Sequence, residues 1–186
     1  MEQNDVLRIY QEAKHLTETL IDQLEQSWEY LRGAVKELTE TVDDLPCRVE
    51  CFHSSDQRFA TVCDVLETLE MQKRRLDERF SAYLGMDLLI ADANMKLLGW
   101  EGEIALSKLP SNSVLEQICD LRALIQRDAA SYADNRAWAE HFIRVVFPRF
   151  LEELYRLSDG EQGGRSFRMQ SVAALCGGFC NGVKIP

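Results

Sequence analysis

Four residues whose side chains can bind zinc lie close together before the middle of the chain. They are Cys47, Cys51, His53 and Cys63, and thiolate and imidazole groups are the ligands that zinc prefers in tetrahedral sites. The spacing C-x3-C-x-H is not one of the common zinc-finger spacings, and a free cysteine is often a small buried hydrophobic residue. Two alternatives therefore stay open here, a zinc site and no cofactor at all.

No other group of residues has the spacing of a catalytic site. The chain contains neither HExxH nor GxSxG, and no glycine-rich phosphate loop ending in Lys-Ser/Thr. No nucleophile or carboxylate motif accompanies His15 or His141, as a catalytic imidazole would need. Cys176 and Cys180 have three residues between them, whereas the thioredoxin-type motif has two. We therefore expect a protein that is not an enzyme.

The elements that would position these groups are predicted to be helices. From residue 3 to residue 45 the chain has no proline, and its apolar residues recur every three or four positions, which is typical of a long helix with a narrow apolar stripe. Pro46 ends this helix. A second stripe runs over 59–83 and stops before Gly85. Two such helices with a short connection favour an antiparallel coiled-coil hairpin over residues 1–84.

The register of this hairpin follows from its short connection. Residues that face each other across it should have numbers that add to about 100. Lys73, the one cation in the second stripe, then lies opposite Trp28, so that its methylene groups would cover the indole ring.

The rest of the chain is predicted to form a compact, mainly helical domain over 85–159 and a glycine-rich tail over 160–186. The stretch 87–100 is compatible with a buried helix and with a short β-hairpin that turns at 92–94, because periodicity does not separate the two. Pro148 must kink or divide the last helix. The predicted fold class is mainly α, a long helical hairpin followed by a small helical domain.

The first predicted helix is longer than the second, so residues 1–16 extend beyond the hairpin. This overhang carries a stripe of apolar side chains, and such a stripe must be covered by the remainder of the chain or by another protein. The stripe consists of Val6, Ile9, Tyr10, Ala13 and Leu16. We interpret it as the partner-binding surface of a chain that assembles with itself or with another protein.

Charge and composition narrow the choice of partners. The chain has 31 acidic and 21 basic residues, and direct binding of nucleic acid is not expected because phosphate recognition needs clustered cations. No apolar run approaches the ~20 residues of a membrane span, so no membrane partner is expected. Six cysteines without a secretory signal favour a cytoplasmic or nuclear protein with free thiols.

These patterns favour a non-enzymatic scaffold subunit that assembles through its acidic N-terminal coiled-coil helix. A metal- or ligand-binding regulatory module is one alternative, using the Cys/His cluster or an apolar pocket around Trp100, Trp138 and Phe142. An acidic inhibitor of a basic nucleic-acid-binding protein is another, since residues 1–45 hold eleven acids against four bases.

Overall fold

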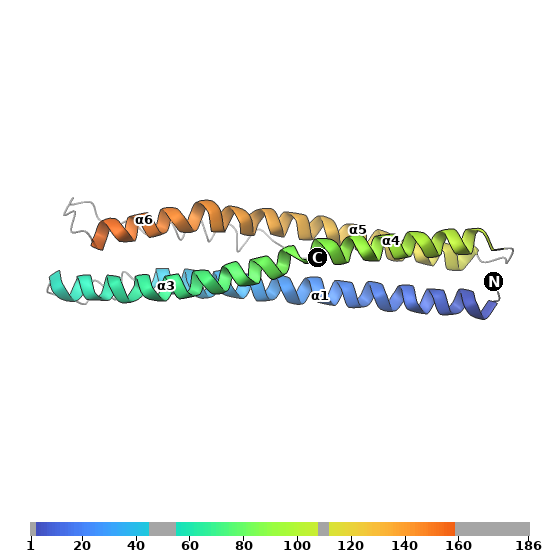
Figure 1. The fold of residues 1–186 in the computed structure, drawn as a ribbon, viewed down its shortest axis with the longest axis horizontal. Helices are drawn as coiled ribbons and strands as arrows, with labels where there is room; N and C mark the ends of the chain where they lie inside the picture. The colour runs from blue at the N-terminus through green and yellow to red at the C-terminus, as the bar shows by residue number, and fades with distance from the viewer. Residues whose placement is uncertain (1–2, 45–54, 108–111, 159–186) are drawn as a thin grey trace. The chain divides into compact units, whose positions relative to one another are not determined.

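The computed structural model describes residues 3–44, 55–107 and 112–158, and all regular structure within these ranges is helical (Figure 1). The predicted mainly-α fold class is therefore confirmed. The elements are α1 (Gln3–Asp43), α3 (Ser55–Leu84), α4 (Met86–Ala105), α5 (Asn112–His141), a π-helical segment η1 (Phe142–Val146) and α6 (Phe147–Ser158).

The β-hairpin alternative for residues 87–100 is not supported, because all of them lie inside α4. The residues expected at its turn make contacts within the helix instead. Lys96 Nζ lies 2.7 Å from Asp92 Oδ2, one turn away, and Asn94 Nδ2 donates to the Ile90 carbonyl at 3.0 Å. A polar trio in an apolar run satisfies a turn and a helix equally well by composition, which is why the pattern left both alternatives open.

The chain forms two compact units, and each takes residues from distant parts of the sequence. Unit 1 is built from residues 1–30 and 80–138, and unit 2 from residues 31–79 and 139 onward. Helices α1, α3 and α5 contribute to both units, whereas α4 belongs to unit 1 and α6 to unit 2. The predicted boundaries after residues 84 and 159 are divisions along the sequence, and they stay a prediction.

The α1 portion of unit 1 buries side chains at intervals of three, four and four. After Ala13 the buried position is Thr17 rather than Leu16, and Leu16 is only half-buried. The Thr17 hydroxyl donates to the Ala13 carbonyl at 2.9 Å, so its burial leaves no unpaired polar atom. Such spacings repeat over eleven residues instead of the heptad's seven, and an eleven-residue repeat favours a right-handed supercoil where a heptad favours a left-handed one.

Unit 2 contains the break that Pro148 was expected to cause. Proline has no N–H to donate to the carbonyl four residues earlier, and its ring clashes with that carbonyl in an α-helix. The segment immediately before Phe147 is the π-helix η1, after which α6 begins. Pro148 therefore lies in the first turn of α6, where the lack of an N–H is tolerated.

Contacts between α1 and α3, which run in opposite directions (Figure 1), differ from the expected pairing. In unit 1, Trp28 lies against Tyr83, with ring centroids 5.9 Å apart. In unit 2, Gln72 Nε2 donates to Thr41 Oγ1 at 2.8 Å. The numbers of these facing residues add to about 110. The prediction of Lys73 opposite Trp28 is wrong, and Lys73 Nζ bonds to Asp77 Oδ2 of its own helix at 2.6 Å.

The long repeat of α1 explains the error in register. Sliding one helix by one full repeat along such a stripe again places apolar residues opposite apolar residues. The hydrophobic pattern therefore fits both registers and does not choose between them.

Candidate protein-interaction surface

Helix α4 is apolar on two opposite faces. Its inner face is buried in unit 1 and consists of Ile90, Ala93, Leu97 and Ile104. At about 100° of rotation per residue, a second set of apolar or small residues falls on the other side of the helix. This outer face consists of Leu88, Ala91, Met95, Leu98 and Gly102, with the C-cap residue Leu106 just beyond the helix, and every one of its members is exposed. The exposed small residues Gly99 and Ala105 flank it.

The large side chains of the outer face are exposed to an unusual degree for their type. The exposed fraction is 76% for Leu88, 66% for Met95, 54% for Leu98 and 87% for Leu106. Single exposed apolar residues are common on proteins, but a contiguous apolar strip on one helix face marks an interaction site. The strip follows the helix for about 27 Å, at roughly 1.5 Å per residue.

A glycine lies on the outer face although nothing within the described chain requires it. A Cβ at Gly102 would meet no atom within 4 Å. Glycine in a helix interior lowers stability by roughly 0.5–1 kcal/mol relative to alanine. A glycine at this position would let the backbone of α4 approach a bound surface closely.

Ion pairs near both ends of α4 hold this helix against α5 within unit 1. Asp87 at the start of α4 bonds to Arg136, and Glu101 near its end lies 3.1 Å from the Arg122 guanidinium (Oε1 to Nε). Because these carboxylates are compensated within the chain, the outer face between them is apolar and carries no unpaired charge from them. The two pairs fix which side of α4 faces outward.

Four aromatic rings anchor the start of α4 in unit 1. Trp28 of α1 contacts both Tyr83 and Trp138, at centroid distances of 5.9 and 5.6 Å, and the rings of Tyr83 and Tyr132 are 4.7 Å apart. These separations and the tilted or edge-on geometry are those that aromatic pairs favour. The cluster joins α1, α3 and α5 at the point where α3 ends and α4 begins.

The break between α3 and α4 frees backbone carbonyls, and a tyrosine hydroxyl satisfies them. The chain turns at Gly85, whose N–H donates to the Ala82 carbonyl at 3.1 Å. The Tyr132 hydroxyl lies 3.1 Å from the Tyr83 carbonyl oxygen and 3.5 Å from that of Leu84. This contact replaces helical hydrogen bonds that the break removes.

Burial alters the acidity of both tyrosines in this network. Burial raises the pKa of Tyr83 to about 12, although its hydrogen bond with Asn135 acts in the opposite direction. The pKa of Tyr132 is also raised, first by burial and then by the negative charge of Asp87. Both hydroxyls therefore stay protonated at neutral pH, and Tyr132 remains a hydrogen-bond donor.

Scans of protein-family models, curated proteins and solved structures give no match to this chain. The site must be interpreted from its own geometry.

The stripe that the sequence assigned to partner binding lies against the protein's own chain. Val6, Ile9 and Ala13 are buried, and Tyr10 and Leu16 are half-buried. A partner could reach these residues only if unit 1 opened. Their role in partner binding stays a prediction, whereas their role in the core of unit 1 is a structural observation.

The predicted zinc cluster falls mainly outside the described residues. Cys47, Cys51 and His53 are not among them, and Cys63 is a half-buried residue of α3. In the described part of the chain, no three His, Cys, Asp or Glu side chains converge as metal ligands would. The zinc site stays a prediction.

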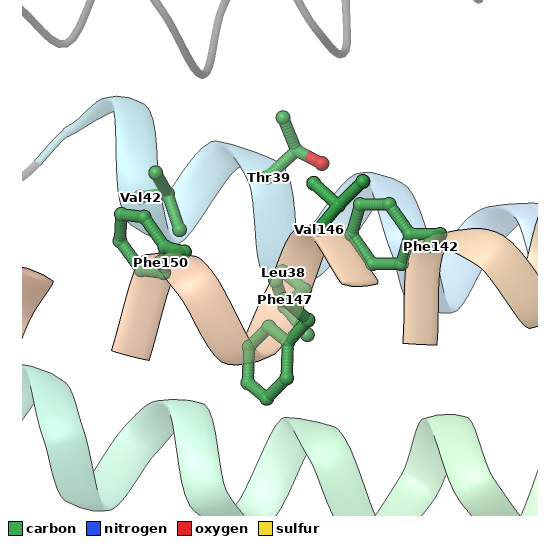
Figure 2. Close-up of a pocket in the computed structure, with 7 residues that line it drawn as sticks. All are labelled: Leu38, Thr39, Val42, Phe142, Val146, Phe147 and Phe150. Atoms are coloured by element: carbon green, nitrogen blue, oxygen red, sulfur yellow. The ribbon is translucent and has the colours of Figure 1, made fainter. Parts of the chain in front are cut away.

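The three residues of the predicted apolar pocket belong to different surroundings. Trp100 is half-buried in α4, Trp138 packs on Trp28 in unit 1, and Phe142 lines a depression in unit 2. Figure 2 shows the side chains of η1 and α6 around this depression together with those of α1. It is lined by Leu38, Thr39, Val42, Phe142, Val146, Phe147 and Phe150.

This depression is too small for an organic ligand. Its volume is about 10 Å³, which is near the minimum for one water molecule and far below the ~300 Å³ of small ligand pockets. The one hydroxyl in its lining, that of Thr39, already donates to the Val35 carbonyl at 2.8 Å. The outer face of α4 is therefore the stronger candidate site.

No described helix is long and apolar enough to cross a membrane.

Proposed function

We propose that the chain is a non-enzymatic protein-interaction module, a scaffold subunit that assembles through the outer face of α4. The observation that carries the proposal is the exposure of four large apolar side chains on the face opposite the buried one. Covering one such side chain with a partner contributes ~1.5–3 kcal/mol. Residues at this spacing are the anchors by which helices recognise apolar grooves and other helices.

The remainder of unit 1 serves in this proposal as a rigid support. The ion pairs of Asp87 and Glu101 hold α4 in one orientation, and a pre-ordered surface loses less entropy on binding. An antiparallel coiled-coil hairpin of α1 and α3 is also part of the proposal. The contact of Trp28 with Tyr83 and that of Gln72 with Thr41 support it.

The acidic residues of α1 have a secondary role in the proposal. Because Val6, Ile9 and Ala13 are buried, the acids of α1 would steer a partner by charge rather than seat it. The cytoplasm or nucleus is the proposed location, where six cysteines would stay reduced.

A protein partner is favoured over a lipid surface by the charge of α4. The helix contains Asp87, Asp92, Glu101 and Glu103 against Lys96 alone. Helices that lie in membrane interfaces carry lysine and arginine on their polar side, because most cellular membrane surfaces are negative. An acidic helix with an apolar face suits a protein partner better.

Site-specific photo-crosslinking in the cells that produce the protein tests this proposal. A photoreactive phenylalanine analogue is placed at Leu88, at Leu98, or at the control position Met71, an exposed residue of α3 in unit 2. Light should attach a protein to the chain from both α4 positions and not from Met71. A lack of protein adducts at both α4 positions, or equal adducts at all three, contradicts the proposal.

A further inference from the structure

We propose that the exposed sides of α4 and α5 in unit 1 together bind one helix of a partner protein, an amphipathic helix that carries lysine or arginine on both sides of its apolar stripe. This inference rests on the proposed function and specifies its partner. It is carried by the direction in which the two exposed sides point, by the sizes of their side chains and by the charges along their edges.

The exposed sides of α4 and α5 point to the same side of unit 1. The ion pairs of Asp87 with Arg136 and of Glu101 with Arg122 join antiparallel helices, because the residue numbers of each pair add to the same total. Both helices turn buried residues such as Leu97 toward the core on one side of this line of ion pairs. At about 100° of rotation per residue, their exposed stripes lie on the other side. The two stripes therefore form one continuous surface, which we call the α4–α5 surface.

The α5 part of the α4–α5 surface consists almost entirely of small side chains. Its exposed residues are Cys119, Ala123, Gln126, Ala130, Ala133 and Ala137. Beside them, Leu88, Met95 and Leu98 extend from α4. The distance between packed helices depends on the side chains at their contact, so a bound helix could lie close to the backbone of α5 and pack its side against the larger residues of α4. A single helix fits such an uneven surface.

The area of the α4–α5 surface is sufficient for one helix. Each stripe is about 27 Å long, and the axes of packed helices lie about 8–10 Å apart, so the surface measures about 27 Å by about 18 Å. A helix of about 18 residues has this length. Its contact would bury about 1,000 Å² in total, which is near the lower limit for specific interfaces. We therefore expect dissociation constants in the micromolar range.

Acidic groups without a counter-charge lie along both edges of the α4–α5 surface. On the α4 edge, Asp92 is compensated by Lys96, whereas exposed Glu103 forms no ion pair with any described residue. On the α5 edge, Arg127 is already bonded to the aspartate that follows it. The carboxylates of this edge that form no ion pair within the described chain are those of Glu116, Asp120 and Asp134. Cations on both sides of an apolar stripe complement this arrangement, whereas a second copy of this chain would bring further acids.

Binding of synthetic helices to the full chain tests the inference. The probe is a fluorescent peptide of about 18 residues, with leucine and alanine on one face and lysine on both sides of it. One control peptide has the same residues in an order that gives no apolar face, and a second has glutamate in place of every lysine. Fluorescence anisotropy should show micromolar binding of the probe and binding of both controls that is weaker by about tenfold or more. Salt should weaken the binding of the probe.

Substitutions in the two helices test whether both contact the probe. Leu98→Gln removes an apolar contact and should weaken binding about tenfold. Ala133→Leu should also weaken it, by keeping the probe away from α5, although the substitution adds apolar surface. Met71→Gln and Ala60→Leu are the matched controls at exposed positions of α3 in unit 2, and they should leave binding unchanged. Circular dichroism melting shows whether the variants are folded.

Neutral substitutions along the edges test the charge of the partner. Glu103→Gln combined with Asp134→Asn removes one carboxylate from each edge, and the probe should bind about two- to tenfold more weakly at low salt. Asp64→Asn combined with Glu67→Gln removes the same charge from exposed positions of α3 in unit 2. This control should change binding by less than about twofold. Equal losses in both double variants would mean that the probe responds only to net charge, and would overturn the inference.

Three further results would overturn the inference: no binding of the probe at about 1 mM, equal binding of the probe and the reordered peptide, or tighter binding to Ala133→Leu. The proposed function can survive these results, because photo-crosslinking tests it separately. With the photoreactive residue at Leu98 or at Ala133, mass spectrometry should place the adducts on a helix with basic edges.

The adducts also separate the other possible occupants. A protein adduct from Leu98 but not from Ala133, or an adduct with twice the mass of this chain, would support an interaction module and overturn the inference. Sedimentation of the chain with neutral phosphatidylcholine vesicles, lost in Leu98→Gln, would overturn both in favour of a lipid surface.

Discussion

Helices α1 and α4 both contribute apolar faces to unit 1, but they differ on the opposite side. The exposed side of α1 in unit 1 is mostly polar, with ion pairs one turn apart such as Arg8 with Glu12 and Lys14 with Glu18. Its exposed large apolar side chains, Leu7 and Tyr30, lie far apart along the helix. The exposed side of α4 carries the apolar outer face beside the exposed charges of Asp87, Lys96 and Glu103. A buried stripe indicates only that a helix packs on something. A second stripe, which stays exposed in the part of the chain that the structure describes, is what locates a candidate surface.

The largest expected difference between the two helices is in their effect on stability. Leu20→Ala in α1 should lower the free energy of unfolding by about 2–5 kcal/mol, because it leaves a cavity in the core of unit 1. Leu98→Ala in α4 should change it by less than about 0.5 kcal/mol, because the side chain is mainly exposed. Urea unfolding measures both. Equal losses would mean that the outer face is part of a core.

Alkaline pH should weaken the anchor at the start of α4. The pKa of Tyr83 is about 12 in the folded chain against an ordinary value of 10, so the folded state retains the proton more strongly. Its contribution to stability is complete below pH 10 and is lost as the pH rises toward 12, up to about 3 kcal/mol. The drop in melting temperature between pH 10 and 12 should be smaller in Tyr83→Phe. An identical drop in both proteins contradicts the assignment.

Removal of the Tyr132 hydroxyl should loosen the same junction by a smaller amount. Tyr132→Phe leaves the Tyr83 and Leu84 carbonyls without their donor, at a cost of about 1–2 kcal/mol. Hydrogen exchange should accelerate at the first amides of α4 more than in α6. Uniform acceleration in both helices would mean that the hydroxyl does not act locally.

The smallest expected effect on stability is that of replacing a glycine in α4 and a glycine in α1. A Cβ at Gly102 of α4 or at Gly33 of α1 meets no atom within 4 Å, so each Gly→Ala change should stabilise the monomer by about 0.5–1 kcal/mol. Gly102→Leu should in addition reduce photo-crosslinking of a partner from Leu98 by steric exclusion, whereas Gly33→Leu should not. Thermal melting and photo-crosslinking separate the two effects. Unchanged adducts in Gly102→Leu would remove this residue from the contact.

The sequence predicted the bounds of the helices better than it predicted which residues of two helices face each other. Its first helix, 3–45, begins with α1 and ends just beyond it, because Pro46 and the regular stripe leave little choice. The register of α1 against α3 was wrong because the stripe has a long repeat that fits two registers. Thr17 was missed as a core residue because a threonine that bonds its own backbone carries no signal of burial in its type.

The outer face of α4 was missed for a different reason. Residues 87–100 are mostly apolar, so their hydrophobicity by itself indicates one buried segment. This segment is the sum of two stripes, one through Ile90 and Leu97 and one through Leu88, Met95 and Leu98. Neither stripe stands out until a structure separates the side that is covered from the side that is not.

Each unit combines residues from distant parts of the sequence, and this affects folding while the chain is synthesised on the ribosome. Unit 1 needs residues 1–30 together with 80–138, so the apolar stripe of α1 leaves the exit tunnel long before the residues that cover it. At ~5–20 residues per second, the nascent chain exposes Val6, Ile9 and Ala13 for about 5–20 s. During that interval we expect this stripe to be a binding site for ribosome-associated chaperones.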